Sequence, residues 1–332
     1  MFCTEEFNKN QFILEKKEFD YVMPPRNRQL SSKIMHVAFN VNDGFFMQTG
    51  VAITSILENN KEKAFWFHVF CDSASDNNLE KMRLTAEKYH TKVTIYFMDM
   101  QPFQTFHLKT KHFSRVTYLR SVMPKILTAM TDRYLYMDAD MICVGDISEI
   151  ERIDLQGYPF AAVSEVPEAV AYKTAFLHQK SGKHFNDGLM WIDIAEWEKE
   201  NITEKIFSYQ GADPSRFSGQ SQDIMNLILD GEIRFIDRRF NGGSENGVLI
   251  YHYNGRNKPW QMAITEAELL WRHYLDLSVW DSMPDPNPPK EPGHYYNYKR
   301  MMVYRKNKGE YLKMLYCLFW YSWLKIRFKT GI

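Results

Sequence analysis

The sequence predicts an α/β fold in which helices flank a mostly parallel central sheet. The first observation is that short apolar runs alternate with segments of helical periodicity through the first half of the chain. The second is composition, because 45% of the 332 residues are hydrophobic and 15% are aromatic, which is ample for a large core. In sheets of this kind, ligands bind beyond the carboxyl ends of the strands.

The first half contains four apolar runs that we expect to be strands. They are residues 34–41, 65–71, 93–98 and 133–137. The turn Asn42-Asp43-Gly44 follows the first run, and a helix is expected after it because apolar residues recur at helical spacing at Val51, Ile53, Ile56 and Leu57. Two more helices are predicted at 76–90, with Asp76 as N-cap, and at 114–127.

The second half is less regular and ends in a distinct tail. Strands are predicted at 160–163, 188–194, 231–236 and 249–253, and helices at 195–209 and 220–229. Five prolines within 284–292 indicate a linker. We therefore expect an N-terminal extension, a main domain, a Pro-rich linker and a C-terminal helical segment, at 1–32, 33–283, 284–293 and 294–332.

Charge is unevenly distributed along a chain of zero formal net charge. Residues 297–332 hold nine Lys or Arg and one acid, so this tail carries +8 and the remainder −8. Zero net charge gives no indication of nucleic acid, and no nucleic-acid partner is expected. A basic tail on an acidic body indicates an anionic surface as partner.

Cysteine spacing and hydropathy indicate the compartment. Cys3, Cys71, Cys143 and Cys317 form no zinc or CxxC spacing, so free thiols in a reducing compartment are expected. The N-terminus lacks the apolar core of a signal peptide, and no run reaches the roughly 18–20 apolar residues of a membrane span. The expectation is a cytoplasmic protein attached to a membrane surface.

Two acidic residues end the predicted strand at 133–137, in the motif Asp138-Ala139-Asp140. On an extended segment, side chains two residues apart point the same way, so both carboxylates can reach one cation. A hard divalent ion prefers oxygen ligands and can bridge diphosphate oxygens. Asp-x-Asp pairs are also common in solvated loops, so the motif alone leaves both interpretations open.

A second motif, His252-Tyr253-Asn254-Gly255-Arg256-Asn257-Lys258-Pro259-Trp260, is more specific. His252 offers a third metal ligand through a neutral ring nitrogen. Gly255 lets backbone approach a phosphate closely, and Lys258 supplies a positive charge to it. Each residue alone has a structural explanation, but their combined spacing favours a phosphate and metal site.

The pair of motifs resembles glycosyltransferase family 8, from about Met35 to Trp260. The N-terminal extension and the basic, aromatic tail are similar to the bacterial lipopolysaccharide core subgroup of α-glucosyl- and α-galactosyltransferases. The resemblance implies a GT-A fold, which is Rossmann-like. It also implies a UDP-glucose or UDP-galactose donor, Mn²⁺ or Mg²⁺, and retention at the anomeric carbon. A lipid-linked core oligosaccharide would be the acceptor, at the inner face of the bacterial inner membrane.

The resemblance assigns donor-binding residues position by position. Asp138, Asp140 and His252 match the metal ligands, with Ala139 between the two acids, and Gly255 and Lys258 match diphosphate contacts. The turn at Asn42 matches the uridine-binding turn, where Asn42 would contact uracil and Phe45 would stack on it. Gly44 and Phe45 depart from the usual Asp-Asp-Asn-Tyr, and Phe45 could instead be a core residue.

Three further residues are assigned to the sugar site by the same resemblance. Arg120 matches an arginine that contacts the sugar and the Asp of the metal motif, with a structural helix arginine as the alternative. Phe185-Asn186-Asp187-Gly188 matches a signature that precedes a strand. Asn186 would contact the sugar, and Asp187, where relatives have a small residue, would be an additional contact or a turn residue.

The segment Gln220-Ser221-Gln222-Asp223 resembles an Asp-Gln-Asp segment beside the anomeric carbon. Gln222 would lie below the anomeric carbon, and Asp223 is either a catalytic acid or a helix N-terminal acid. Ser221 replaces an acid that holds sugar hydroxyls in relatives. Because an amide is a poor nucleophile, front-face attack by the acceptor is favoured over a covalent intermediate.

Residues 311–328 of the tail combine aromatic side chains with flanking Lys and Arg. This composition suits an interfacial helix on anionic lipid, and packing on the catalytic domain is the alternative. Two other functions remain open. One is a capsule or protein-glycan UDP-hexose transferase of the same fold, and the other is a non-catalytic membrane-docked scaffold, which only Ser221 and Gly44 favour.

Overall fold

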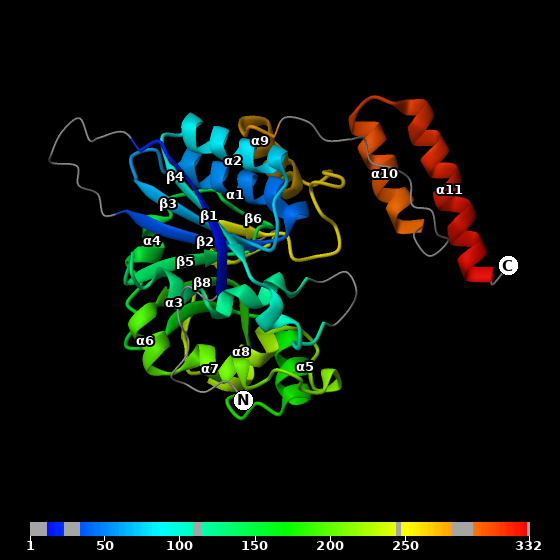
Figure 1. Cartoon of the computed structure of the whole chain (residues 1–332). Coiled ribbons are helices and arrows are strands. Elements are labelled where there is room, and N and C mark those ends of the chain that lie inside the picture. Colours follow the sequence, from blue (N-terminus) through cyan, green and yellow to red (C-terminus); the bar gives the residue numbers. More distant parts are fainter. Residues whose placement is uncertain (1–11, 23–33, 109–113, 244–246, 281–294, 331–332) are drawn as a thin grey trace. The chain divides into compact units, whose positions relative to one another are not determined.

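The computed structural model describes residues 12–22, 34–108, 114–243, 247–280 and 295–330 (Figure 1). The chain forms two compact units, Met1–His252 and Tyr253–Ile332. The two units meet between His252 and Tyr253, whereas the main domain was expected to continue to residue 283. The predicted linker at 284–293 lies outside the described residues.

The first unit is built on a mixed sheet in the order β1-β4-β3-β2-β5-β8-β7-β9. These strands are β1 (Ile13–Asp20), β2 (Met35–Val41), β3 (Phe65–Cys71), β4 (Lys92–Met98), β5 (Arg133–Met137), β7 (Phe160–Ser164), β8 (Phe185–Asp193) and β9 (Arg234–Ile236). Strands β4, β3, β2 and β5 run parallel to one another, as does the pair β7 and β9. Strands β1 and β8 are antiparallel to their neighbours. The predicted α/β fold with a mostly parallel sheet is confirmed.

The central strands are buried on both faces, which explains their nearly continuous apolar sequences. Figure 1 shows α1 and α2 on one side of the sheet and α6, α7 and α8 on the other. The helices are α1 (Phe46–Asn59), α2 (Asp76–Lys88), α3 (Met123–Leu127), α4 (Ser148–Glu151), α5 (Pro167–Leu177), α6 (Ile194–Lys199), α7 (Ile202–Phe207) and α8 (Ser221–Leu229).

Several predicted boundaries were wrong. The segment expected as an extension contains β1, which pairs with β4 at the edge of the sheet. The N-cap of α2 is Ser75, whose hydroxyl accepts the backbone N–H of Asn78, and Asp76 is the first helical residue. The predicted helix at 114–127 is a 3₁₀ helix, Arg115–Ser121, followed by α3, where Pro124 occupies the first turn.

The helix predicted at 195–209 is interrupted between α6 and α7. Asn201 has φ of 51°, in the left-handed region, so a continuous helix cannot pass through it. Strand β8 begins at Phe185, so the Phe-Asn-x-Gly signature lies inside a strand and does not precede one.

A small second sheet joins β6 (Met141–Cys143) to β10 (Ile250–His252). The two strands are antiparallel, and His252 lies opposite Met141. The backbone N–H of Cys143 donates to the hydroxyl of Ser55 on α1 at 2.9 Å, which attaches β6 to that helix. This sheet brings residue 252 beside residue 140.

The second unit contains α9 (Glu266–Leu277), α10 (Tyr295–Asn307) and α11 (Tyr311–Thr330). Helix α9 begins with a capping box between Thr265 and Glu268. Helices α10 and α11 form a hairpin whose core holds Tyr298, Met301, Cys317 and Leu324. Among the helices in the described ranges, none is long and apolar enough to cross a bilayer.

Candidate active site

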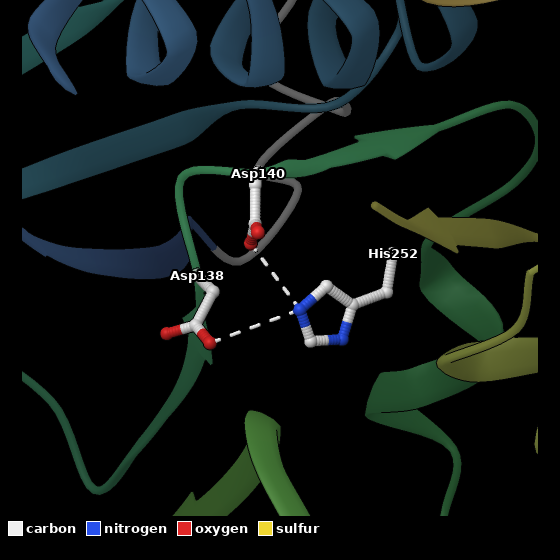
Figure 2. A group of neighbouring side chains, drawn as sticks. All are labelled: Asp138, Asp140 and His252. Carbon is white, nitrogen blue, oxygen red and sulfur yellow. Dashed lines mark ion pairs between the residues drawn. The ribbon is translucent and has the colours of Figure 1, made fainter. Parts of the chain in front are cut away.

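Three side chains that could hold a metal ion converge where β5 ends (Figure 2). Asp138 follows β5, Asp140 precedes β6 and His252 ends β10. The Nε2 of His252 lies 3.2 Å from a carboxylate oxygen of Asp140 and 3.9 Å from one of Asp138. Two carboxylates and one imidazole, with ligand atoms within 4.8 Å of one another, suit a hard or borderline divalent cation. The three residues therefore fit the predicted Mn²⁺ or Mg²⁺.

A hydrogen-bonded chain of amides orients the imidazole. Nδ1 of His252 lies 2.8 Å from the side-chain oxygen of Asn241, which fits an Nδ1–H tautomer that presents the Nε2 lone pair to the carboxylates. The Asn241 amide in turn donates to the Asn186 side-chain oxygen at 2.9 Å. Asn186 thus supports the candidate metal site through Asn241, and its contact with the sugar stays a prediction.

Gly188 leaves room for this arrangement. A Cβ at this position would lie 2.6 Å from a ring carbon of His252 and 2.9 Å from oxygens of Asn186 and Asp138. Any side chain here would therefore displace two of the candidate ligands. The close approach, and not backbone conformation, explains why the signature ends in glycine.

Arg120 connects the metal site to Asp187. Its guanidinium lies 3.0 Å from Asp138 Oδ1 and 2.5 Å from Asp187 Oδ2, and its centre is 4.5 Å from the centroid of the Tyr136 ring. The Tyr136 hydroxyl donates to the same Asp138 oxygen at 2.5 Å. Both Asp138 and the arginine are therefore held in place by buried neighbours, and the contact between them is the one that the resemblance implied.

Asp187 is buried in β8 and is not a turn residue. Its carboxylate also accepts a hydrogen bond from the Ser221 hydroxyl at 3.0 Å. Burial raises the pKa of Asp187, against the opposing charge of Arg120. Two of the positions that depart from the family pattern, Asp187 and Ser221, are thus in direct contact, with a carboxylate on β8 and a hydroxyl on α8.

Gln222 lies in a second polar cluster, with a residue that the sequence analysis missed. Its amide nitrogen donates to Glu165 at 3.1 Å, and the Asn186 amide donates to the same Glu165 oxygen at 2.9 Å. Burial alone would raise the pKa of Glu165, but these two hydrogen bonds lower it below its usual value. Glu165 directly follows β7, and an acid at a strand's carboxyl end is a signal that could have identified it.

Asp223 is fully buried at the start of α8. Its carboxylate accepts the backbone N–H groups of Ser218 and Gly219 at 2.7 and 2.6 Å and pairs with Lys173 at 3.0 Å. Burial raises its pKa, yet the Lys173 charge and these hydrogen bonds bring the net pKa below the ordinary value. Nearby, burial lowers the pKa of His184 to about 4, and Lys173 adds to this effect. The carboxylate is thus engaged on both oxygens.

The turn at Asn42 lies at the same edge of the sheet as Asp138, because β2 and β5 are parallel neighbours. The Asn42 side-chain oxygen accepts the Gly44 N–H at 3.1 Å, and Phe45 is 38% exposed at the start of α1. The alternative that Phe45 is a core residue is therefore wrong. Stacking of the Phe45 ring on uracil stays a prediction.

Gly255 and Lys258 lie in the second unit. Lys258 Nζ donates to the Tyr253 carbonyl at 2.5 Å and lies 5.4 Å from the centroid of the Trp260 ring. A Cβ at Gly255 would meet no atom within 4 Å, so packing does not require glycine there. Their phosphate contacts stay predictions.

The fold and the ligand cluster together define a GT-A glycosyltransferase, and sequence comparison gives the family. The profile of Glycosyl transferase family 8 matches residues 36–263, so the chain belongs to this family and is a UDP-sugar glycosyltransferase.

Several of the relatives that match this chain are named as lipopolysaccharide glycosyltransferases. The chain is 29% identical to a lipopolysaccharide 1,2-glucosyltransferase of Escherichia coli K12, covering 75% of this chain and 80% of that protein. It is 30% identical to a lipopolysaccharide 1,3-galactosyltransferase of Salmonella typhimurium, covering 68% and 72%. The fold matches galactosyltransferase LgtC, solved with donor and acceptor sugar analogues, with a TM-score of 0.67, 19% identity and coverage of 75% and 98%.

Proposed function

We propose that this glycosyltransferase moves glucose or galactose from a UDP-hexose to a lipopolysaccharide core oligosaccharide, with retention at the anomeric carbon. The names of the two bacterial relatives support the sugar and the acceptor class. The observation that carries the proposal is the convergence of Asp138, Asp140 and His252 at the end of β5. Transfer to a capsule or protein glycan is the alternative acceptor class.

The ligand cluster would hold Mn²⁺ or Mg²⁺, which when bound offsets negative charge on the departing UDP. The protein's own contribution is to fix the donor. Arg120 holds Asp138 in position, and Asn241 holds His252. Asn42 and Phe45 would receive the uracil, and Gly255 and Lys258 the diphosphate.

At the sugar, Gln222 offers an amide, and both oxygens of Asp223 are engaged by Lys173, Ser218 and Gly219. Neither group suits nucleophilic attack, which favours approach of the acceptor hydroxyl from the face that UDP leaves. The departing phosphate oxygen would accept the hydroxyl proton.

The α10–α11 hairpin supports the proposal of attachment to a membrane surface. Large apolar side chains are exposed along α11. Six of them recur at helical spacing, at Leu312, Leu315, Tyr316, Phe319, Trp323 and Ile326, and Tyr311, Leu318 and Phe328 are exposed on other sides of the helix. Lys313, Lys325, Arg327 and Lys329 lie on the same helix and suit anionic headgroups. We therefore propose a cytoplasmic enzyme that is peripheral on the bacterial inner membrane, where a lipid-linked acceptor is available.

A UDP-hexose turnover assay tests the function. Purified protein is incubated with UDP-glucose or UDP-galactose, with and without Mn²⁺, and with a truncated lipopolysaccharide core as acceptor. We expect metal-dependent release of UDP and an α-linked product, and loss of both in Asp140→Ala. The folded state of that variant is checked by circular dichroism. A folded Asp140→Ala enzyme with normal turnover would disprove the role, and an inactive wild-type protein that still binds membranes would favour the scaffold.

A further inference from the structure

Helix α5 (Pro167–Leu177) lies beside the candidate active site and was not predicted from the sequence. It begins two residues after Glu165, with Pro167 in its first turn. Since Glu165 bonds to Gln222 and Asn186, the start of α5 is fixed at the edge of the proposed sugar site.

One side of α5 is tied to that site. Lys173 pairs with the buried carboxylate of Asp223 at 3.0 Å, and Leu177 is buried. Just beyond the helix, the Gln179 amide donates to the Asn226 carbonyl of α8 at 2.9 Å. The helix is therefore anchored by its polar groups and by one apolar residue at its end.

The neighbouring side of α5 displays an aromatic pair. Tyr172 and Phe176, one turn apart, are 60% and 37% exposed. Their rings are stacked, with centroids 5.9 Å apart and planes inclined by 23°. Ala171 and Ala175 beside them are also exposed and too small to cover the rings. A single exposed apolar residue is ordinary, but a stacked aromatic pair on a helix at the rim of an active site is typical of a binding surface.

We propose that Tyr172 and Phe176 form a platform on which a pyranose ring of the acceptor oligosaccharide stacks. This proposal rests on the proposed function, because that reaction requires a second sugar beside Gln222. A pyranose ring presents C–H groups on its faces and hydroxyls around its rim. The faces can therefore cover the electron-rich face of an aromatic ring while the hydroxyls stay hydrated.

The charge of α5 favours a sugar over an anionic headgroup as the occupant. Its charged residues are Glu168 and Lys173, and Lys173 is already paired with Asp223. The basic side chains that would suit a lipid surface lie on α11 instead. A neutral aromatic pair on the helix whose Lys173 is paired with Asp223 suits a glycan.

Direct binding of a saccharide tests the platform independently of turnover. The probe is a lipid-free core oligosaccharide prepared from truncated lipopolysaccharide, titrated into the full-length protein by saturation-transfer NMR. We expect Tyr172→Ala and Phe176→Ala each to raise the Kd by about threefold to tenfold, and Tyr172→Phe, which keeps the ring, to leave it unchanged. Leu14→Ala, an exposed apolar position on β1, is the matched control and should bind as the wild type does.

Donor hydrolysis separates failure of the platform from failure of the proposed function. UDP-hexose hydrolysis without acceptor should be the same in Tyr172→Ala, Phe176→Ala and wild type. An unchanged saccharide Kd in both alanine variants overturns the platform, as does absence of saccharide binding by the wild type. Weaker binding of both variants to phosphatidylglycerol vesicles, with saccharide binding intact, also overturns it in favour of a lipid surface. A wild type without UDP-hexose turnover would refute the proposed function, while the titration would still decide the platform.

Discussion

The active-site cluster buries charged side chains, whereas the α10–α11 hairpin exposes large apolar ones. At the cluster, Arg120, Asp187 and Asp223 are buried and ion-paired, Arg120 with Asp187 and Asp223 with Lys173. In the hairpin, large apolar side chains such as Leu312 and Phe319 are exposed around a small core. The comparison teaches that the charged groups of the cluster are held in place before any ligand binds, whereas the exposed apolar side chains of α11 need a further surface, of lipid or of protein, to cover them.

Removing the positive charge of Arg120 at the centre of the cluster should have the largest effect, a loss of folding stability. Arg120→Met leaves Asp138 and Asp187 without their shared cation in a buried setting. We expect the free energy of unfolding to fall by about 3–5 kcal/mol, as is typical when one partner of a buried ion pair is removed. Urea denaturation followed by circular dichroism measures the change.

A matched variant sharpens this prediction. Arg83 also pairs with two acids, Glu80 and Glu87, but at the surface. Because water and salt screen such pairs, Arg83→Met should leave the denaturation midpoint almost unchanged. Equal losses of stability in Arg120→Met and Arg83→Met would show that burial does not strengthen the ion pairs of the cluster.

Filling the space at Gly188 should have the next largest effect. In Gly188→Ala the added methyl group would displace His252 and Asp138, so we expect Mn²⁺ affinity to fall by about 10–100-fold. Isothermal titration calorimetry measures the affinity, and the urea midpoint checks that the fold persists. Undiminished Mn²⁺ binding by the folded variant would count against these ligands.

Substitutions in the hairpin should alter membrane binding and leave stability intact. Phe319→Ser and Trp323→Ser each remove an exposed apolar side chain from α11. We expect each to weaken partitioning onto phosphatidylglycerol vesicles by about 1–2 kcal/mol, since apolar contact contributes about 25 cal/mol per Å². Vesicle sedimentation measures this. Equal vesicle binding by wild type and both variants would argue for packing of α11 on protein.

The smallest expected effect is a loss of folding stability at acid pH, when Asp223 is protonated. Its pKa is lowered in the folded protein, so its stabilising contribution is complete above the unfolded pKa and is lost as the pH falls through the folded pKa. The difference in unfolding free energy between wild type and Asp223→Asn should therefore be constant near neutrality. It should shrink below about pH 3.9, the ordinary pKa of an aspartate. If this difference grew on acidification, the prediction that the lowered pKa of Asp223 stabilises the folded protein would be wrong.

Local sequence patterns predicted the central fold because its strands are buried on both faces. The apolar runs of β2, β3 and β5 are visible without any knowledge of their neighbours. Strand β1 was missed because it is a largely exposed edge strand whose residues 15–18 are all charged, so it shows no alternation of polar and apolar residues and its identifying feature is pairing with β4. Helix α5 was missed because its apolar residues follow no amphipathic pattern.

The candidate site was predictable where residues belong to a motif and unpredictable where they act through space. Asp138, Asp140 and His252 were identified from spacing, and the structure brings them together. Asn241 has no motif of its own, and its importance depends on its contact with His252. Glu165 also belongs to no motif, and its position directly after β7 is the one sequence signal for it, while its contact with Gln222 appears in the structure. The link between Asp187 and Ser221 likewise crosses 34 positions of sequence.

The direction in which the His252 side chain points depends on the register of the short β6–β10 ladder. Adjacent residues of a strand face opposite sides, so a slip by a single position would turn His252 away from Asp140. Three residue pairs alone fix the register of this ladder only weakly. The side chains of Ser55 and Asn59 on α1 add hydrogen bonds to the backbone of Cys143, which hold β6 in place. A mutation in that helix, some 80 positions before the acidic motif, could therefore misalign the cation's nitrogen ligand without touching it.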